Sequence, residues 1–458
     1  MNIAKFNGDS FTSLMASKLR LHNFLYHSIC LAALLLLSGC HAYILDDAQQ
    51  DLRSSFTAGD YERSTQLLEK FKSDDVYKGK DAVLKNLESG MVHHFAGNYD
   101  SSNVFFDKSE KQIDDAYTKS ISRGLASLLV NDNTLVYDGE PYEDVYLNAF
   151  KSLNYVQLGD WEAALVETRR MAFKMEQLDI RIKGLAEAFA QKDTTGKVDW
   201  SSGEVNIQNS AFSHYLAAVL YAKTGKPDDA RIEFEKLGTA LQEQSRLTER
   251  ETSLKELERI REPQNYNVLI SAFSGQAPIK QQEDFRLWLD AEDGEGSFYV
   301  KFSIPTIHLY PSRVYSIRAK IDETYIPLHL IEEMDVVSKE VYKAKKPVIY
   351  ARSLLRATVK ATGSTLIASS VRKENKGLGL LVDILGIIGQ EATEKADLRG
   401  WQTMPGKAWM NVIELPPGNH PIEIQYLSRT GRVLFTEHQS ITVEENTALE
   451  LVESIYSQ

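Results

Sequence analysis

The stretch Leu158-Gly159-Asp160-Trp161-Glu162-Ala163-Ala164 separates two amphipathic segments, and its pattern occurs three more times in the N-terminal half of the chain. The other copies read Ala58-Gly59-Asp60-Tyr61, Ala96-Gly97-Asn98-Tyr99 and Thr224-Gly225-Lys226-Pro227. Glycine readily takes the left-handed conformation that ends a helix, and Asp or Asn caps the helix that follows. We expect the aromatic residue after the cap to pack between the two helices. The four stretches therefore predict tight helical hairpins.

Between these turns the apolar residues keep a helical spacing, as at Leu84, Leu87, Met91 and Phe95. The turns resemble those of the tetratricopeptide repeat (TPR), whose small residues let paired helices approach closely. The glycines are 38, 62 and 66 residues apart and do not follow the steady period of about 34 residues that such repeats show. We expect an irregular TPR-like helical array over residues 40–262, and a plain helical bundle with similar turns is the alternative.

The second half, from near Asn265, changes its period. Apolar and polar residues alternate along residues 298–304, 315–322 and 422–426. A period of two with one polar face indicates antiparallel strands that cover a core on one side. The turn at 415–421 looks like that of immunoglobulin-like or transthyretin-like sandwiches. We expect an α+β multidomain protein, in which residues 263–458 form a β-sandwich-like domain with a helical insertion at about 331–393.

The predicted insertion contains the most apolar segment that follows the N-terminal region, Gly377-Leu378-Gly379-Leu380-Leu381-Val382-Asp383-Ile384-Leu385-Gly386-Ile387-Ile388-Gly389. It is shorter than the roughly 20 residues that span a bilayer. One interpretation is a helix buried against the sheet, with glycines where the elements cross closely. The other is a surface that contacts lipid or a partner protein.

The N-terminus resembles a bacterial lipoprotein signal. Lys18 and Arg20 precede an apolar run that ends in Leu37-Ser38-Gly39-Cys40, and the spacing resembles a lipobox. The resemblance implies cleavage of residues 1–39, acylation of Cys40 with palmitate-type chains, and an anchor that holds the protein firmly. A short transmembrane helix and an ordinary secretory signal are the alternatives. His41 follows the cysteine in place of aspartate, which favours the outer membrane. Translation starts at Met1 or Met15.

The chain of 458 residues carries a net charge of −12, and removal of residues 1–39 would make the remainder more acidic. An acidic surface argues against nucleic acid as a partner. The only cysteines are Cys30 and Cys40, so the mature chain would have no disulfide framework. We expect its stability to come from the packing of the core.

Two further stretches are similar to a poorly characterised family of bacterial envelope lipoproteins with a TPR-like N-terminal half and a β-rich C-terminal half. They are the run from Asn131 through Tyr142 and the run from Ala396 through Pro405. The resemblance implies an envelope lipoprotein of unassigned activity, with a suspected part in cell-wall assembly. It brings no catalytic residues with it.

The family-like stretches supply the candidate site residues. Asn131, Asp132 and Asn133 form either a structural joint, because short amides and carboxylates bond their own backbone in turns, or a recognition loop. Arg399 and Trp401 offer a similar choice between an interdomain contact and a ligand contact. Trp401 is either a core aromatic that joins the insertion to the sandwich or a platform for a ligand.

None of the common catalytic, nucleotide-binding or metal-binding motifs occurs in the sequence, so no catalytic residue, cofactor or metal is predicted. We expect a lipid-anchored, periplasm-facing outer-membrane lipoprotein that acts as a scaffold for another envelope protein. Helical arrays form extended grooves suited to such partners. The alternatives are a cell-wall hydrolase that uses paired carboxylates, and a binder of a small envelope ligand or lipid.

Overall fold

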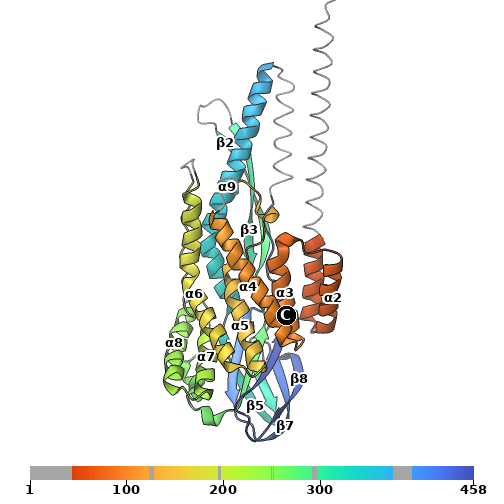
Figure 1. Ribbon diagram of the computed structural model, residues 1–458, viewed down its shortest axis with the longest axis vertical. Helices are drawn as coiled ribbons and strands as arrows, with labels where there is room; N and C mark the ends of the chain where they lie inside the picture. The colour runs from red at the N-terminus through yellow and green to blue at the C-terminus, as the bar shows by residue number, and fades with distance from the viewer. Residues whose placement is uncertain are drawn as a thin grey trace, which may run out of the picture.

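The computed structural model describes residues 44–122, 128–193, 198–248, 250, 252–290, 297–374 and 395–458. Helices occupy the N-terminal half and strands form most of the C-terminal half, so the predicted α+β class is confirmed. In Figure 1 the helices α3 to α8 lie side by side, with the main sheet at the lower end of the molecule. Among the described residues, no helix is both long and apolar enough to cross a membrane.

The helical half consists of hairpins. A helix over residues 44–57 is followed by elements with these bounds: α2 (Tyr61–Ser73), η1 (Gly79–Asp81), α3 (Ala82–Phe95), α4 (Tyr99–Ser122), η3 (Asp132–Thr134), α5 (Pro141–Gln157), α6 (Trp161–Ala190), α7 (Ala211–Lys223), α8 (Pro227–Ser245), η4 (Leu254–Arg261) and η5 (Pro263–Asn265). Within the hairpins, α3 packs on α4, α5 on α6, and α7 on α8. Each hairpin turn falls at one of the predicted glycines.

The turns have the predicted geometry. Gly59, Gly97, Gly159 and Gly225 have φ between +71° and +75°. In the turn at Gly159, the glycine N–H donates to the Val156 carbonyl and the next N–H to the Tyr155 carbonyl, which is the Schellman pattern. The Asp160 carboxylate then accepts the Ala163 N–H at 3.0 Å and caps α6. Local physical chemistry therefore accounts for the hairpins.

The strands form a seven-stranded sheet and a separate two-stranded hairpin. The larger sheet has the order β8-β7-β4-β5-β6-β1-β9, and only the β1–β9 pair is parallel. Its strands are β1 (Val268–Ser274), β4 (Ser316–Ile321), β5 (Thr324–Glu332), β6 (Lys407–Ile413), β7 (Gly418–Leu427), β8 (Val433–Val443) and β9 (Glu450–Tyr456). Strand β5 pairs with β4 through residues 324–328 and with β6 through residues 329–332. The strands thus form one continuous sheet.

Two hydrophobic cores lie on opposite faces of this sheet. Apolar residues from all seven strands, among them Ile270, Ile317 and Ile424, form one core. The other face of β1, β6 and β9 packs against the helices through Phe273, Met410 and neighbouring residues. All seven residues of β1 are buried for this reason. The helices and the sheet therefore share a core.

The strands β2 (Ile279–Asp290) and β3 (Ser297–His308) pair only with each other and pack on α9 (Met334–Glu374). The predicted alternation is present, since Val300, Phe302 and Ile304 are buried against Ala357 and Ala361 of this helix. However, the sequence pattern placed these strands in the sandwich, whereas they form a hairpin outside the main sheet.

The predicted helical insertion at 331–393 corresponds to α9 in its described part. The apolar segment Gly377–Gly389 lies outside the described residues, as do Cys40 and the rest of the predicted signal.

Candidate functional site

Arg399 joins segments that are far apart in the sequence. Its guanidinium donates to the Asp81 carboxylate at 2.9 Å and makes two hydrogen bonds, of 2.9 and 2.6 Å, to the Asp397 carboxylate. It also donates to the backbone carbonyls of Lys80, Asp132 and Leu135. The Asp81 side chain is fully buried, and that of Arg399 is only 7% exposed. Such a planar, multiply bonded cation holds chain segments in a fixed relation.

Asn131, Asp132 and Asn133 lie beside Arg399, so the structure brings the two predicted sets of site residues together. The Asp132 carboxylate pairs with Arg352 at 2.5 Å and with Arg356 at 3.5 Å, both from α9. The Asn133 carbonyl accepts from Lys80 at 2.7 Å, and the Asn131 carbonyl accepts from Thr134. These internal contacts favour the structural joint over the recognition loop. A recognition role for the loop stays a prediction.

A cavity of about 100 Å³ opens beside this loop, and we call it the junction cavity. At one side the Glu140 carboxylate accepts from Lys280 at 2.5 Å and from Lys345 at 2.9 Å. Burial alone would raise the pKa of Glu140, but the two lysines outweigh burial and lower it. The other walls combine apolar side chains, which include Leu135, Val136, Leu185, Phe189, Val348 and Ile349, with the charged residues Asp132, Asp138, Arg352 and Asp397. Apolar walls with a few fixed charges are typical of sites for small ligands.

Trp401 is a buried core aromatic, 3% exposed. Its ring packs edge-on against Phe106 of α4 and Phe150 of α5, with ring centroids 5.7 and 6.0 Å apart. The sequence pattern predicted that a core Trp401 would join the insertion to the sandwich. These aromatic contacts instead join the segment that leads into β6 to the helices.

Two buried carboxyls hold this segment. Glu143 accepts the Trp401 N–H at 2.7 Å, and Glu88 accepts the Gln402 N–H at 2.8 Å and the Thr403 hydroxyl at 2.6 Å. Burial raises the pKa of each carboxyl to about 7. Raised pKa values also occur in general acids. Here, however, both groups bond the backbone of one segment, so their geometry accounts for a structural role.

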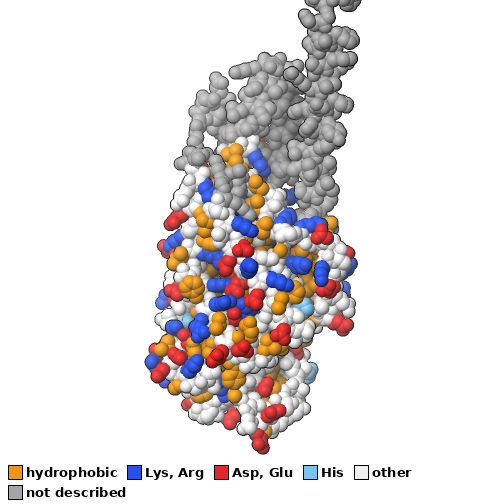
Figure 2. Space-filling view, viewed as in Figure 1, with side chains coloured by type: hydrophobic (Ala, Val, Ile, Leu, Met, Phe, Trp, Pro, Cys, Tyr) orange, Lys and Arg blue, Asp and Glu red, His pale blue; other side chains and the backbone are white. Residues whose placement is uncertain are grey.

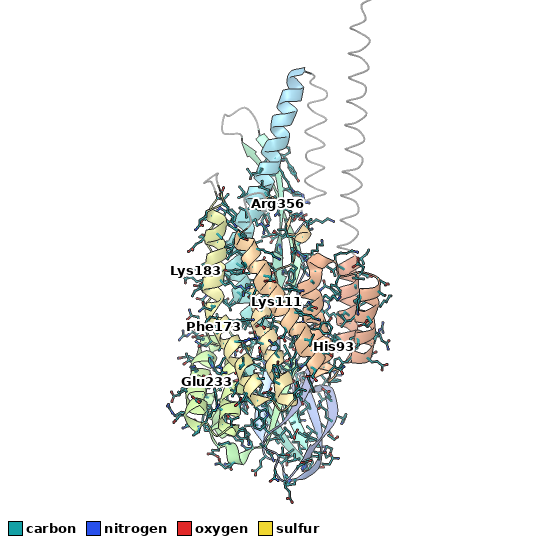
Figure 3. The ribbon with its side chains drawn as sticks, viewed as in Figure 1. His93, Lys111, Phe173, Lys183, Glu233 and Arg356 are labelled. Carbon is teal, nitrogen blue, oxygen red and sulfur yellow. The ribbon has the colours of Figure 1, made fainter. Side chains whose placement is uncertain are left out.

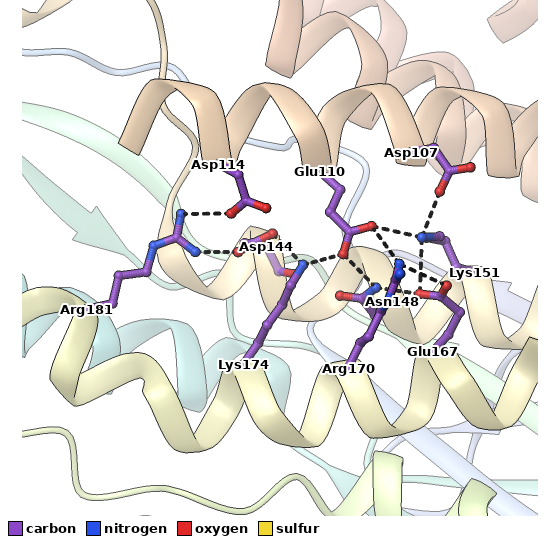
Figure 4. Close-up of polar contacts among 10 residues, drawn as sticks. All are labelled: Asp107, Glu110, Asp114, Asp144, Asn148, Lys151, Glu167, Arg170, Lys174 and Arg181. Carbon is purple, nitrogen blue, oxygen red and sulfur yellow. Dashed lines mark hydrogen bonds and ion pairs between the residues drawn. The ribbon is translucent and has the colours of Figure 1, made fainter. Parts of the chain in front are cut away.

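A second hollow, of about 550 Å³, lies between α4 and α6, and we call it the α4–α6 groove. Its floor is a ladder of alternating charges, shown in Figure 4. Lys151, 1% exposed, pairs with Asp107, Glu110 and Glu167 at 2.8 to 3.1 Å. Lys174 bridges Glu110 and Asp144, and Arg181 continues the ladder from Asp144 to Asp114.

The ladder fixes the positions of α4, α5 and α6. Burial would raise the pKa of Glu110, but Lys174 and Lys151 outweigh burial and lower the pKa to about 2. Glu110 therefore stays charged over a wide range of pH. The exposed Lys111 and Asp115 lie on the α4 rim and form none of the ion pairs described for the ladder. In Figure 2 basic, acidic and apolar side chains are mixed over this face of the molecule.

Except for Asp132 in the wall of the junction cavity, sequence reasoning missed the charged residues of both hollows, because charged side chains are usually exposed. One signal was present for Lys151 and Glu167. Each lies among the inward-facing residues of its helix, at a position where an apolar residue is expected. A charge at such a position indicates a buried ion pair.

Comparison with protein-family models, curated proteins and solved structures finds no match to this chain. The similarity to envelope lipoproteins therefore stays a prediction.

Proposed function

We propose that this chain is a lipid-anchored lipoprotein of the outer membrane that faces the periplasm and serves as a non-enzymatic scaffold. It would bind a segment of another envelope protein in the α4–α6 groove, as one member of a cell-wall assembly system. Cys40 would carry the lipid. The lipobox-like sequence supports the anchor, and the groove supports the scaffold.

The observation that carries the scaffold proposal is the rigid, charged floor of the groove. Its little-exposed residues are held by ion pairs across three helices, so a partner would meet a preformed surface; they are Glu110, Asp144, Lys151, Glu167 and Lys174. Preorganisation lowers the entropy cost of binding. The rim residues Lys111 and Asp115 would then set partner choice through charge, since exposed charges mainly affect specificity and association rate.

We further propose that the helical hairpins are degenerate TPR-like repeats and that the seven-stranded sheet is a variant of an immunoglobulin-like or transthyretin-like sandwich. Glycine turns of one geometry support the first part. A core built from all seven strands supports the second.

The test is photo-crosslinking in cells, with a crosslinking amino acid in place of Lys111. We expect a discrete product that contains another envelope protein and is lost in Asp115→Lys. Glu69→Lys on α2 is a matched charge reversal outside the groove and should leave the product unchanged. A product that survives Asp115→Lys, or none at all, would contradict binding in the groove.

The junction cavity favours a second candidate function, the binding of a small envelope ligand. Apolar walls beside the Lys280–Glu140–Lys345 ion pairs support it. A bulky residue in the wall, as in Val348→Trp, should fill the cavity. If the cavity binds a ligand, native mass spectrometry of protein purified from cells should show a bound mass that this variant lacks.

A further inference from the structure

The outer face of α6 carries apolar residues at intervals of seven. Val166, Phe173 and Ile180 are 39%, 63% and 62% exposed. Seven residues are close to two helical turns, so the three side chains form one stripe along the helix. The opposite face of α6 is already packed, since Ala164, Met171, Met175, Leu178 and Ile182 are buried in the core. We call the exposed stripe the α6 ridge.

The ridge stands between two hollows. Phe173 lines both the α4–α6 groove and a hollow of about 390 Å³ that α6 shares with α7 and α8. In Figure 3 Phe173 lies on the same side of the molecule as Lys111 and Lys183. Exposed apolar residues that occur singly are common, but a regular stripe on a helix is the pattern of a helix-pairing surface.

From this pattern we propose that the α6 ridge binds the α6 ridge of a second copy of the chain, in antiparallel orientation, with Phe173 on the two-fold axis. The three apolar residues are evenly spaced about Phe173. A two-fold axis there places Phe173 against the partner's Phe173 and Val166 against the partner's Ile180. Every apolar residue of the stripe then meets another, as an isologous interface requires.

The flanking charges are complementary in the same arrangement. Arg169 lies four residues before Phe173 and Glu176 three residues after it, on the side of α6 that faces α7 and α8. The antiparallel copy brings Arg169 opposite the partner's Glu176, and the symmetry repeats the pair. Farther out, Glu162 comes opposite the partner's Lys183. All four of these residues are exposed.

The charges also decide against the parallel arrangement. In a parallel pair the two-fold axis runs along α6, so the α7–α8 side of one copy faces the α4 side of the other, and Arg169 comes opposite the partner's Arg170 while Glu176 comes opposite the partner's Gln177. Like charges directly opposite each other weaken association. Glu176 forms no ion pair or hydrogen bond with the described residues of its own chain, so its carboxylate is available to a second copy.

The antiparallel dimer agrees with a common membrane anchor. The two-fold axis runs across α6, in the direction from α8 towards α4, α3 and α2. Figure 1 shows α2 and the start of the described chain at the edge of the molecule away from α8. The axis keeps these edges of both copies on one side of the dimer. Both N-termini can therefore reach the same membrane.

This inference goes beyond the proposed scaffold function and does not depend on it. The test uses the full chain in cells, with single cysteines on α6 and non-reducing gel electrophoresis of membranes. Phe173→Cys should form a disulfide-linked dimer, because paired helices 8–10 Å apart bring facing Cα atoms within disulfide range. Ile232→Cys on α8, whose native side chain is 41% exposed, is the matched control and should stay monomeric.

Two further cysteine variants test the orientation. Val166→Cys and Ile180→Cys should each fail to crosslink alone, because identical residues would lie roughly 20 Å apart along the antiparallel helices. Co-expressed with different tags, the two variants should crosslink to each other. Val166→Cys crosslinked to itself would overturn the antiparallel arrangement. Equal crosslinking of Phe173→Cys and Ile232→Cys, or none in either, would overturn the interface.

Charge exchange tests the flanking pairs by analytical ultracentrifugation of the detergent-solubilised chain. Arg169→Glu and Glu176→Arg should each weaken the dimer by roughly tenfold or more, because each change creates two like-charge pairs. The double variant should restore the affinity. If it stays as weak as the single variants, the proposed pairing is wrong. Circular dichroism checks that each variant keeps its fold.

Discussion

Replacement of Arg399 by alanine should destabilise the protein by about 4 kcal/mol, because removal of one partner of a buried ion pair costs about 3–5 kcal/mol. The variant removes the guanidinium that pairs with Asp81, whose side chain is fully buried. It also removes three hydrogen bonds, donated by two guanidinium nitrogens, to the backbone carbonyls of Lys80, Asp132 and Leu135. Arg399→Lys keeps the charge but loses the planar fork, so we expect about half of this cost.

The assay is urea unfolding followed by circular dichroism, combined with hydrogen exchange read by mass spectrometry. Loss of the three carbonyl bonds should speed exchange in residues 131–137 before global unfolding, since these residues depend on Arg399 for attachment. Asp81→Asn combined with Arg399→Ala should cost less than the sum of the single changes, because the two residues share one interaction.

Three results would contradict the role of Arg399 in fastening these segments. If Arg399→Ala costs less than about 1 kcal/mol, the value of an exposed ion pair, the guanidinium does not fasten the segments. Additive costs in the double variant would show that Asp81 and Arg399 act independently. Unchanged exchange in residues 131–137 would return the loop to the recognition interpretation.

Three further predictions concern the turns, the buried carboxyls and the anchor. Gly159→Ala, at φ +74°, should cost about 1 kcal/mol in urea unfolding, whereas Gly79→Ala, with open space and no positive φ, should cost little. Burial raises the pKa of Glu143 to about 7 and so favours its protonated form, and its contribution to stability should fall by on the order of 3 kcal/mol as pH rises from about 4.5 to 7. Glu88 contributes over the same pH range, so Glu143→Gln should reduce the slope of stability against pH without abolishing it. An unchanged slope would exclude a contribution from Glu143. Cys40→Ala should abolish palmitate labelling and release the protein from membranes, and persistent membrane retention would contradict the lipid anchor.

The helical hairpins could be predicted because their information is local. Gly159 and Asp160 end one helix and cap the next through bonds within five residues. The change to strands near Asn265 could be predicted for a similar reason, since alternation is visible along a single segment. The pairing of strands could not, because β1 joins β9 across about 180 residues and no local pattern specifies that register.

The contacts within the polar sites could not be predicted from the sequence, for the same physical reason. Arg399 and Asp132 were identified as candidates, but Asp81 is 318 positions from Arg399 and has no feature that marks it as its partner. Glu140, Lys280 and Lys345 meet from three separate elements. The α6 ridge differs from these cases, since its spacing of seven is visible in the sequence. Only the structure shows that the stripe faces outwards.

The shared core determines how the proposed functions should be tested. Phe273 of β1 packs against Phe95, Phe150 and Phe212 of the helices, with ring centroids 5.2 to 6.4 Å apart. Removal of the helical half would expose this face of the sheet, and an exposed apolar face binds other proteins without specificity. The loss or gain of a partner after such a deletion would therefore not distinguish the loss of a specific binding site from the exposure of the sheet. Single changes at exposed residues, Asp115 in the groove and Ile180 on the ridge, leave the core intact and separate the two surfaces.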